Sequence, residues 1–189
     1  MEAHIIPQLL IIAGTGRNTG KTTLACQIIR KFRAYRSIYA IKITPHFYKN
    51  LQTGIVLTDN PNLYIAEETD TSTGKDSSLM LEAGAQKSYF VMATNEYLCT
   101  AITNIIKLIP SDSLIVCESG GLRNWVVPGL FFMMDKINEG CLKSDIEKLK
   151  ILADRVITFD GEKFDFNPET IGISGNQWTL KQIPYDTIL

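Results

Sequence analysis

Short apolar runs alternate with amphipathic segments along most of the chain. The apolar runs predict strands, several of them buried on both faces, at residues 8–13, 37–44, 88–92, 114–117, 130–134 and 155–159. Segments in which apolar residues recur at helical spacing predict helices at residues 20–35, 75–84, 95–109 and 144–152. Gly84 would end the second of these helices, and Asn95 would cap the third. Strands that alternate with helices predict an α/β fold with a mostly parallel sheet flanked by helices.

Two regions depart from this alternation. Residues 54–58 and 63–67 predict two short strands joined by a turn, and the polar residues 69–74 that follow predict a loop. Beyond Gly161, fragments around Phe164 and Ile171 have the pattern of a hairpin. We therefore expect a single domain over residues 1–189, with a small β-hairpin appendage.

The run GTGRNTGKTT, residues 14–23, carries the clearest chemical signal. A glycine-rich loop that follows a buried strand and opens a helix is the context of a P-loop. Gly16 and Gly20 let consecutive backbone N–H groups turn inward, and these donors form an anion cradle with the helix N-terminus. The strict P-loop pattern has glycine where this chain has Thr15, and Gly14 lies one residue earlier.

This loop predicts a P-loop NTPase-like fold that binds a nucleotide with Mg²⁺. Lys21 would reach the terminal phosphates as a point charge, and Thr22 would offer its hydroxyl to Mg²⁺. Arg17 is expected either to contact a phosphate or to be solvated. The residues predicted to contact the nucleotide are Gly16, Arg17, Asn18, Thr19, Gly20, Lys21, Thr22 and Thr23.

Acidic residues near the predicted loop are candidates for the magnesium site. In parallel sheets, ligands bind beyond the carboxyl ends of the strands. Glu118 ends a buried strand there and precedes Ser119 and two glycines, as a Walker-B carboxylate does. We expect Thr22 and Glu118 to hold the metal and Lys21 and Glu118 to act in catalysis, whereas the alternative for Glu118 is a solvated strand end. Asp70 or Asp76 could also reach the metal.

Further polar residues leave alternatives open. Lys42 alternates with apolar neighbours, which favours a solvent-facing position unless it contacts a substrate. His46 is a candidate metal ligand or base, although a lone surface histidine is usually neither. Asp160 follows a predicted strand and could meet a guanine edge, but we favour a turn residue, since Gly161 follows it.

Composition narrows the classes of partner. The chain has 19 Lys and Arg against 20 Asp and Glu, which gives no sign of a nucleic-acid-binding face. No apolar segment approaches the length that crosses a bilayer, and the N-terminus lacks the basic start of a signal peptide. The four cysteines lack CxxC spacing and are expected to be buried free thiols. We therefore expect a cytoplasmic protein with no nucleic-acid or membrane partner.

The order of motifs resembles the MobB family of P-loop proteins. The resemblance lies in GTGRNTGKTT, then KITPH at residues 42–46, then GKDSSLMLEAGA at residues 74–85, then LIVCESGG at residues 114–121. It covers about the first 120 residues, with Ile43 and Pro45 in place of family histidines. The resemblance implies Mg²⁺-dependent GTP binding with weak hydrolysis. It also implies an adaptor role in attaching the nucleotide of the molybdenum cofactor, beside a guanylyltransferase partner.

Two other functions fit the same loop. One is an ATP-dependent small-molecule kinase or ligase that resembles dethiobiotin synthetase, in which Lys42 or Thr44 would face the substrate. The other is a nucleotide sensor in which residues 69–76 order around the γ-phosphate. The guanine signature Asn-Lys-x-Asp is absent, so only the resemblance favours GTP over ATP. A homodimer is expected if the apolar run at residues 125–134 is exposed, but a buried strand explains that run more simply.

Overall fold

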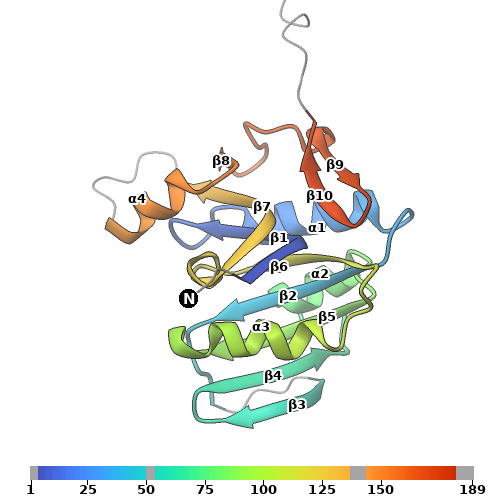
Figure 1. Ribbon diagram of the computed structural model, residues 1–189, viewed down its shortest axis with the longest axis vertical. Helices are drawn as coiled ribbons and strands as arrows, with labels where there is room; N and C mark the ends of the chain where they lie inside the picture. Colours follow the sequence, from blue (N-terminus) through green and yellow to red (C-terminus); the bar gives the residue numbers. More distant parts are fainter. Residues whose placement is uncertain (1–3, 50–53, 137–143, 182–189) are drawn as a thin grey trace, which may run out of the picture.

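The computed structural model describes residues 4–49, 54–136 and 144–181. One large sheet is built from β1 (His4–Gly14), β2 (Ile38–Thr44), β3 (Ile55–Asn60), β4 (Leu63–Glu68), β5 (Lys87–Ala93), β6 (Leu114–Glu118), β7 (Val126–Asp135) and β8 (Arg155–Thr158). Its strands lie in the order β3-β4-β5-β2-β6-β1-β7-β8 (Figure 1). β1, the strand that precedes the predicted phosphate loop, therefore lies inside the sheet, between β6 and β7.

The sheet is mostly parallel, as the sequence predicts. The pairs β5–β2, β2–β6, β6–β1, β1–β7 and β7–β8 are parallel. Only the β3–β4 hairpin and its pairing to β5 are antiparallel. The carboxyl ends of β1, β2 and β6 therefore meet at one edge, which is where a ligand site is expected.

Helices cover both faces of the sheet. The apolar residues of α1 (Lys21–Phe32) and α2 (Asp76–Glu82) pack on one face, and those of α3 (Leu98–Ile106) and α4 (Ser144–Ile151) pack on the other. Short 3₁₀ turns complete the chain at η1 (Asn95–Tyr97), η2 (Leu122–Asn124) and η3 (Pro168–Thr170). Among the described helices, none is long and apolar enough to cross a membrane.

Two helix boundaries differ clearly from the sequence-based expectation, and one is confirmed. The first helix ends at Phe32, because Phe32 is the last residue of its apolar stripe that packs on the sheet and Tyr35 is exposed. The third begins with the η1 turn, and Thr94 rather than Asn95 is its capping residue. Gly84 does end α2, with a left-handed φ of 106°.

The C-terminal hairpin of β9 (Ile171–Ser174) and β10 (Gln177–Leu180) belongs to the core and is not an appendage. Trp178 is fully buried on the α1 face, where its ring meets Phe32 edge-on at 5.2 Å. Its indole N–H donates to the carbonyl of Ile115 at 3.1 Å. A buried aromatic side chain of this size anchors the hairpin to the sheet.

The apolar run in the second half of β7 is a buried strand. Leu130 to Met134 pack between the two helical layers and expose almost nothing. The strand interpretation is therefore confirmed, and this run offers no apolar surface for a homodimer. Cys26 and Cys117 are buried free thiols as expected, Cys99 is partly exposed, and Cys141 lies outside the described residues.

Candidate nucleotide site

The loop between β1 and α1 has the backbone that its glycines predict. Gly20 caps α1 in the left-handed conformation, with φ 80°, and Asn18 is also left-handed at φ 58°. At Gly14, a Cβ atom would lie 2.8 Å from the hydroxyl of Thr19 and 3.0 Å from Cδ of Lys21. Gly14 thus leaves room for the Lys21 side chain to fold back over the loop. Gly14 is therefore the glycine that the close approach of Thr19 and Lys21 requires, even though Thr15 departs from the strict P-loop pattern.

Lys21 lies across the loop that precedes it. Its Nζ donates to the carbonyl of Gly16 at 2.6 Å and to the hydroxyl of Thr19 at 3.1 Å. Burial lowers the pKa of this ammonium, and the nearby Glu118 carboxylate opposes that shift. The Lys21 ammonium therefore lies against the glycine-rich loop that opens α1. A phosphate site at a helix N-terminus needs a cation in this position.

Thr22 joins the loop to two carboxylates from distant parts of the chain. Its Oγ1 lies 2.9 Å from Oδ1 of Asp76, at the start of α2, and 2.7 Å from Oε2 of Glu118, at the end of β6. A hydroxyl has one proton, so it can donate to only one of these oxygens at a time. The other close oxygen–oxygen contact has no proton between the atoms, which favours a cation beside these three groups.

Lys42 ties the same two carboxylates together. Its Nζ lies 2.6 Å from Oδ2 of Asp76 and 2.5 Å from Oε1 of Glu118. The Glu118 side chain is only 3% exposed and that of Lys42 only 17%. The expectation that Lys42 faces solvent is therefore wrong, because its strand position points into the site and its ammonium is a counter-ion.

The ionisation of this cluster follows from these contacts. Burial alone would lower the pKa of Lys42, but the Glu118 charge and the hydrogen bonds to both carboxylates outweigh it, so the pKa is raised. Burial alone would raise the pKa of Asp76, but the hydrogen bond from Lys42 outweighs it and the pKa is lowered. Both groups are therefore charged over the neutral pH range.

The strand register explains why these side chains meet. Glu118 is paired with Ile12 of β1 on one side and with Lys42 of β2 on the other, and Lys42 is in turn paired with Phe90 of β5. Directly paired residues project from the same face of a sheet. One row of side chains therefore crosses β1, β6, β2 and β5, in the order Ile12, Glu118, Lys42 and Phe90. This row lies on the face of the sheet that α1 and α2 cover.

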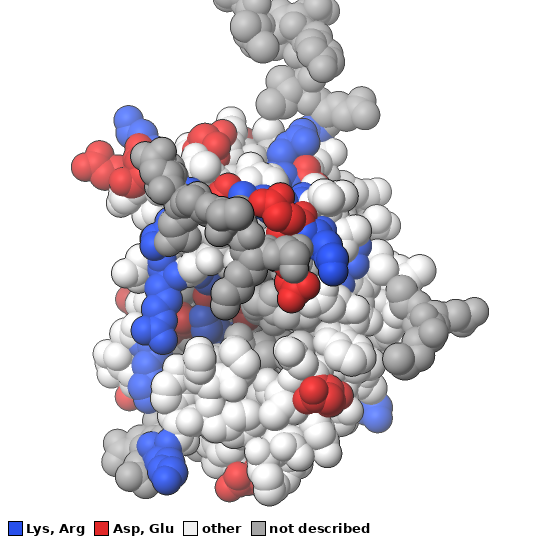
Figure 2. Space-filling model, turned by 90° about the vertical axis from the view of Figure 1, so that its left-hand side faces the viewer, with Lys and Arg blue, Asp and Glu red and all other residues white. Residues whose placement is uncertain are grey.

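A cleft of about 1040 Å³ opens along this edge of the sheet. Figure 2 views the molecule from the end toward which β1 and β2 point, and Lys and Arg side chains gather along one border of it. The cleft is lined by the glycine-rich loop with the start of α1, the end of β2 with the segment after it, the start of α2, Phe90 and the end of β6. All eight residues predicted to contact the nucleotide are among the lining residues: Gly16, Arg17, Asn18, Thr19, Gly20, Lys21, Thr22 and Thr23.

Of the two aspartates considered for the metal, the structure brings only Asp76 to the site. Asp70 is exposed, and its Oδ1 accepts from the N–H and hydroxyl of Ser72 in a local turn. The buried Glu68 accepts from the backbone N–H groups of Thr69 and Asp70 and from the hydroxyl of Ser77. Glu68 therefore fixes the loop that leads into α2 and so helps to place Asp76.

Asp160 and His46 stay outside the polar cluster. Oδ1 of Asp160 accepts from the N–H groups of Glu162 and Lys163, so the turn interpretation is confirmed. His46 is exposed at the border of the cleft, where its backbone N–H donates to the hydroxyl of Thr44. Neither residue contacts the carboxylates that bind Lys42.

One contact to the phosphate loop was missed by sequence reasoning. The ring of Phe159, just after β8, lies so close to Gly20 that a Cβ there would be 2.8 Å from it. Phe159 also contacts the ring of Phe164 at 4.6 Å, in the small hairpin that Asp160 turns. No local pattern signals this packing, because 139 residues separate the two sides of the contact.

The polar cluster fits Mg²⁺ better than a metal held by protein alone. Within the described ranges, no three His, Cys, Asp or Glu side chains lie close enough together to hold a metal ion. Mg²⁺ is usually bound by one or two carboxylates, several waters and substrate phosphates. The hydroxyl of Thr22 with the carboxylates of Asp76 and Glu118 supplies such a set beside the phosphate loop.

Comparisons with known protein families, with curated proteins and with solved structures give no match for this chain.

Proposed function

We propose that the chain binds a purine nucleoside triphosphate with Mg²⁺ and hydrolyses it weakly. The observation that carries this proposal is the convergence of Lys21, Thr22, Asp76 and Glu118 at a glycine-rich loop that opens a helix. A helix N-terminus with a lysine suits phosphate groups, and the adjacent carboxylates suit the metal that accompanies them.

Each side chain has a separate task under this proposal. Lys21 exchanges its contacts with Gly16 and Thr19 for phosphate oxygens, and the loop N–H groups bind the same phosphates. Thr22, Asp76 and Glu118 would hold Mg²⁺, which supplies charge neutralisation between the terminal phosphates. Lys42 adds a second ammonium on the β2 side and, by its hydrogen bond, lowers the pKa of Asp76.

Slow turnover fits the hydrogen bonding of the acids. Both Asp76 and Glu118 accept from Lys42, and both lie against Thr22. The hydrogen bond from Lys42 lowers the pKa of Asp76, so this carboxylate is a poor general base. Binding therefore dominates over catalysis in this proposal.

The resemblance to the MobB family supports the finer part of the proposal. It favours GTP over ATP and an adaptor role beside a guanylyltransferase in the attachment of the molybdenum cofactor's nucleotide. In the described residues, the cleft lining contains no Asn-Lys-x-Asp signature that would select guanine. The choice of base and the adaptor role are thus proposals from motif order alone.

Titration calorimetry with GTP and ATP, each with and without Mg²⁺, tests the proposed function. We expect the Lys21→Ala variant to lose about 100-fold in affinity, the loss typical of hydrogen bonds to a charged group. The matched control is Lys148→Ala, since Lys148 is exposed on α4 and lies outside the cleft. Full affinity in Lys21→Ala, or no binding of either nucleotide at millimolar concentration, would refute the proposal.

A small-molecule kinase or ligase is the second candidate. It is favoured because the cleft continues past Lys42 to Thr44, Lys49 and Phe90, where a second reactant has room. Phosphate release under multiple turnover, with and without small carboxylate compounds, separates the candidates. Stimulation by one of these compounds supports the kinase or ligase, and an unchanged slow rate supports the binding protein.

A further inference from the structure

The cleft has a second half that the phosphate site does not use. This half, which we name the β5-side pocket, is lined by Thr44, Tyr48, Lys49 and Phe90. Phe90 is half-buried, whereas the residues before and after it in β5 are buried. It packs against Tyr64, Ala66 and Met92. Its ring is therefore held in place on one side and faces the cleft on the other.

The size of the cleft leaves space beyond a nucleotide's phosphates. Small-molecule sites usually measure about 300–1,000 Å³, and this cleft lies at the upper end with about 1040 Å³. The lining residues come from the end of β1, the glycine-rich loop with the first turn of α1, the end of β2 with the segment after it, the start of α2, β5, and the end of β6 with the segment after it. None that the structure describes comes from β7 or β8. The space extends to one side of the phosphate loop, the β5 side.

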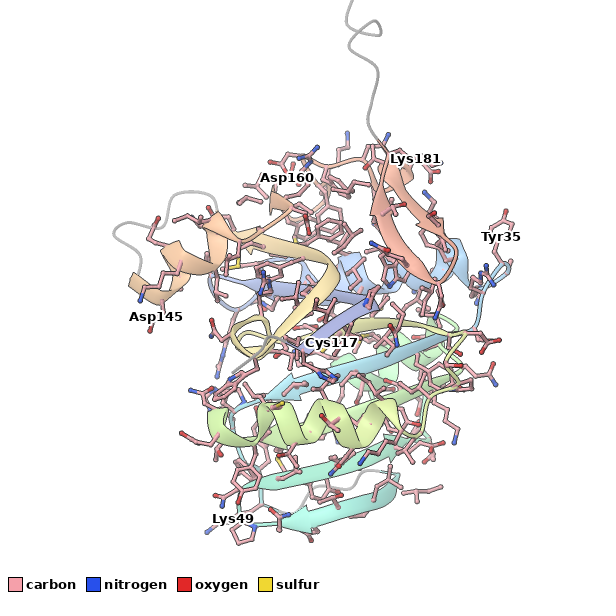
Figure 3. All side chains as sticks on the ribbon, in the orientation of Figure 1. Tyr35, Lys49, Cys117, Asp145, Asp160 and Lys181 are labelled. Atoms are coloured by element: carbon pink, nitrogen blue, oxygen red, sulfur yellow. The ribbon has the colours of Figure 1, made fainter. Side chains whose placement is uncertain are left out.

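The magnesium ligands indicate which end of the nucleotide faces this side. Mg²⁺ bridges the terminal phosphates of a bound triphosphate. Lys42 of β2 is bonded to Asp76 and Glu118, so under the proposed function the terminal phosphate would face β2 and the nucleoside would lie on the other side of the loop. Figure 3 shows Lys49 at the lower end of the molecule, near β3, and Asp160 at the opposite end, above β8. The β5-side pocket therefore lies beyond the terminal phosphate.

Charge and ring chemistry describe the ligand that this pocket would take. The described lining carries five cationic side chains, at positions 17, 21, 42, 49 and 75, but only the acids Asp76 and Glu118. Both acids are bonded to Lys42, so they do not offset the charge of Lys49. The net charge of the lining is therefore positive at Lys49. Phe90 and Tyr48 offer flat apolar surface beside that charge. A ligand with an anionic group and a planar body satisfies both features.

We propose that the β5-side pocket binds a second ligand, a small anionic molecule with an aromatic or otherwise planar body, next to the terminal phosphate. The position relative to the phosphate rests on the proposed nucleotide binding, whereas the pocket itself is defined by Thr44, Tyr48, Lys49 and Phe90. The ligand is held by Lys49 through its charge and by Phe90 through its ring face. The same chain then holds two ligands at once.

Fluorescence titration with 1-anilinonaphthalene-8-sulfonate as the probe tests this inference, using the full chain saturated with Mg²⁺ and a non-hydrolysable GTP analogue. We expect Phe90→Ala to weaken probe binding about fivefold, as loss of a ring contact does. Lys49→Gln should weaken it about threefold, as loss of one exposed charge does. Lys87→Gln is the matched control, since Lys87 lies on β5 outside the cleft and pairs with Glu67.

Three results would overturn the inference. The first is displacement of the probe by the nucleotide, which would show that the nucleoside itself fills the pocket. The second is equal binding of the uncharged analogue N-phenyl-1-naphthylamine, and the third is unchanged probe affinity in both variants. Lys21→Ala separates this inference from the proposed function. Retained probe binding with lost nucleotide binding supports both, and retained nucleotide binding refutes only the phosphate site.

Discussion

The two sides of β1 show how one sheet can serve stability and chemistry separately. Ile12 of β1 is paired with Glu118 on one side and with Phe132 on the other. On the Glu118 side the row continues to Lys42 and the cleft. On the Phe132 side the side chains are apolar, and Phe132 packs against Phe166 with ring centroids 5.3 Å apart. The two residues paired with Ile12 therefore differ in kind. Glu118 belongs to an ion pair with Lys42, and Phe132 belongs to a pair of packed rings.

This difference indicates which side supplies the stability. Buried ion pairs often contribute nothing compared with well-packed apolar side chains, because desolvation offsets their attraction. Closely packed rings and aliphatic chains contribute in proportion to the apolar area that they bury. The β7 side, with Phe132 and Phe166, therefore stabilises the fold, and the β2 side retains its charges for a ligand.

The largest expected effect is at the apolar contact of the C-terminal hairpin, away from the charged row. Trp178→Ala should lower the free energy of unfolding by about 3–5 kcal/mol, because it removes a fully buried ring. Nucleotide affinity of the folded protein should stay within about threefold of the wild type, since additivity holds for distant sites. Urea unfolding and calorimetry measure the two quantities. Trp178→Phe serves as the milder variant, and a large loss of affinity in it would contradict the separation.

The next effect concerns the ion pair itself. Lys42→Met should lower the free energy of unfolding by about 2–3 kcal/mol, somewhat less than for a fully buried pair, because Asp76 is partly exposed. The double variant Lys42→Met with Glu118→Leu should recover most of this loss, since the row then becomes apolar as it is at Phe132. It should also lose Mg²⁺-dependent nucleotide affinity. Thermal unfolding with and without Mg²⁺ and nucleotide measures both changes, and a double variant less stable than Lys42→Met would show that the charges support the fold.

A smaller effect is expected in the pH dependence of binding. The pKa of Lys21 is lowered chiefly by burial, so the ammonium loses its proton at a lower pH than an exposed lysine. Because only the charged form attracts phosphate, Mg²⁺-free nucleotide affinity should fall as the pH rises through that pKa, by about tenfold per unit above it. Lys21→Arg keeps its charge throughout this range. A pH profile of Lys21→Arg as steep as the wild type's would assign the loss to another group.

The smallest effect is expected at the turn beyond β8. Asp160→Asn should change the ratio of GTP to ATP affinity by less than about twofold and stability by less than about 0.5 kcal/mol, as for surface substitutions. The amide oxygen of asparagine can still accept from Glu162 and Lys163. Competition titrations measure the ratio. A marked loss of GTP preference would show that Asp160 meets the base and that the β7 side takes part in binding.

The sequence was enough to predict most strands of the sheet and the residues of the glycine-rich loop, but not the residues that meet that loop from other parts of the chain. Apolar runs identified the strands of the parallel sheet, and the glycines of residues 14–23 identified the loop, since both signals are local. The ends of the first and third predicted helices were wrong, because tertiary packing sets where an apolar stripe ends. The roles of Lys42 and Asp76 stayed open because a charged residue in an alternating strand looks the same whether it faces solvent or a carboxylate.

The sequence by itself determined the α/β alternation, the glycine-rich loop and the position of Lys21 and Thr22, since each depends on neighbours within a few residues. Only the tertiary structure decided that Asp76 joins the site while Asp70 does not, that Lys42 bridges two acids, and that the C-terminal hairpin belongs to the core. These outcomes depend on tertiary packing, which brings together residues 96 positions apart in the polar cluster and joins Phe32 to Trp178 of the hairpin. Local preferences carry no information about such pairings, because they arise only when the whole sheet is assembled.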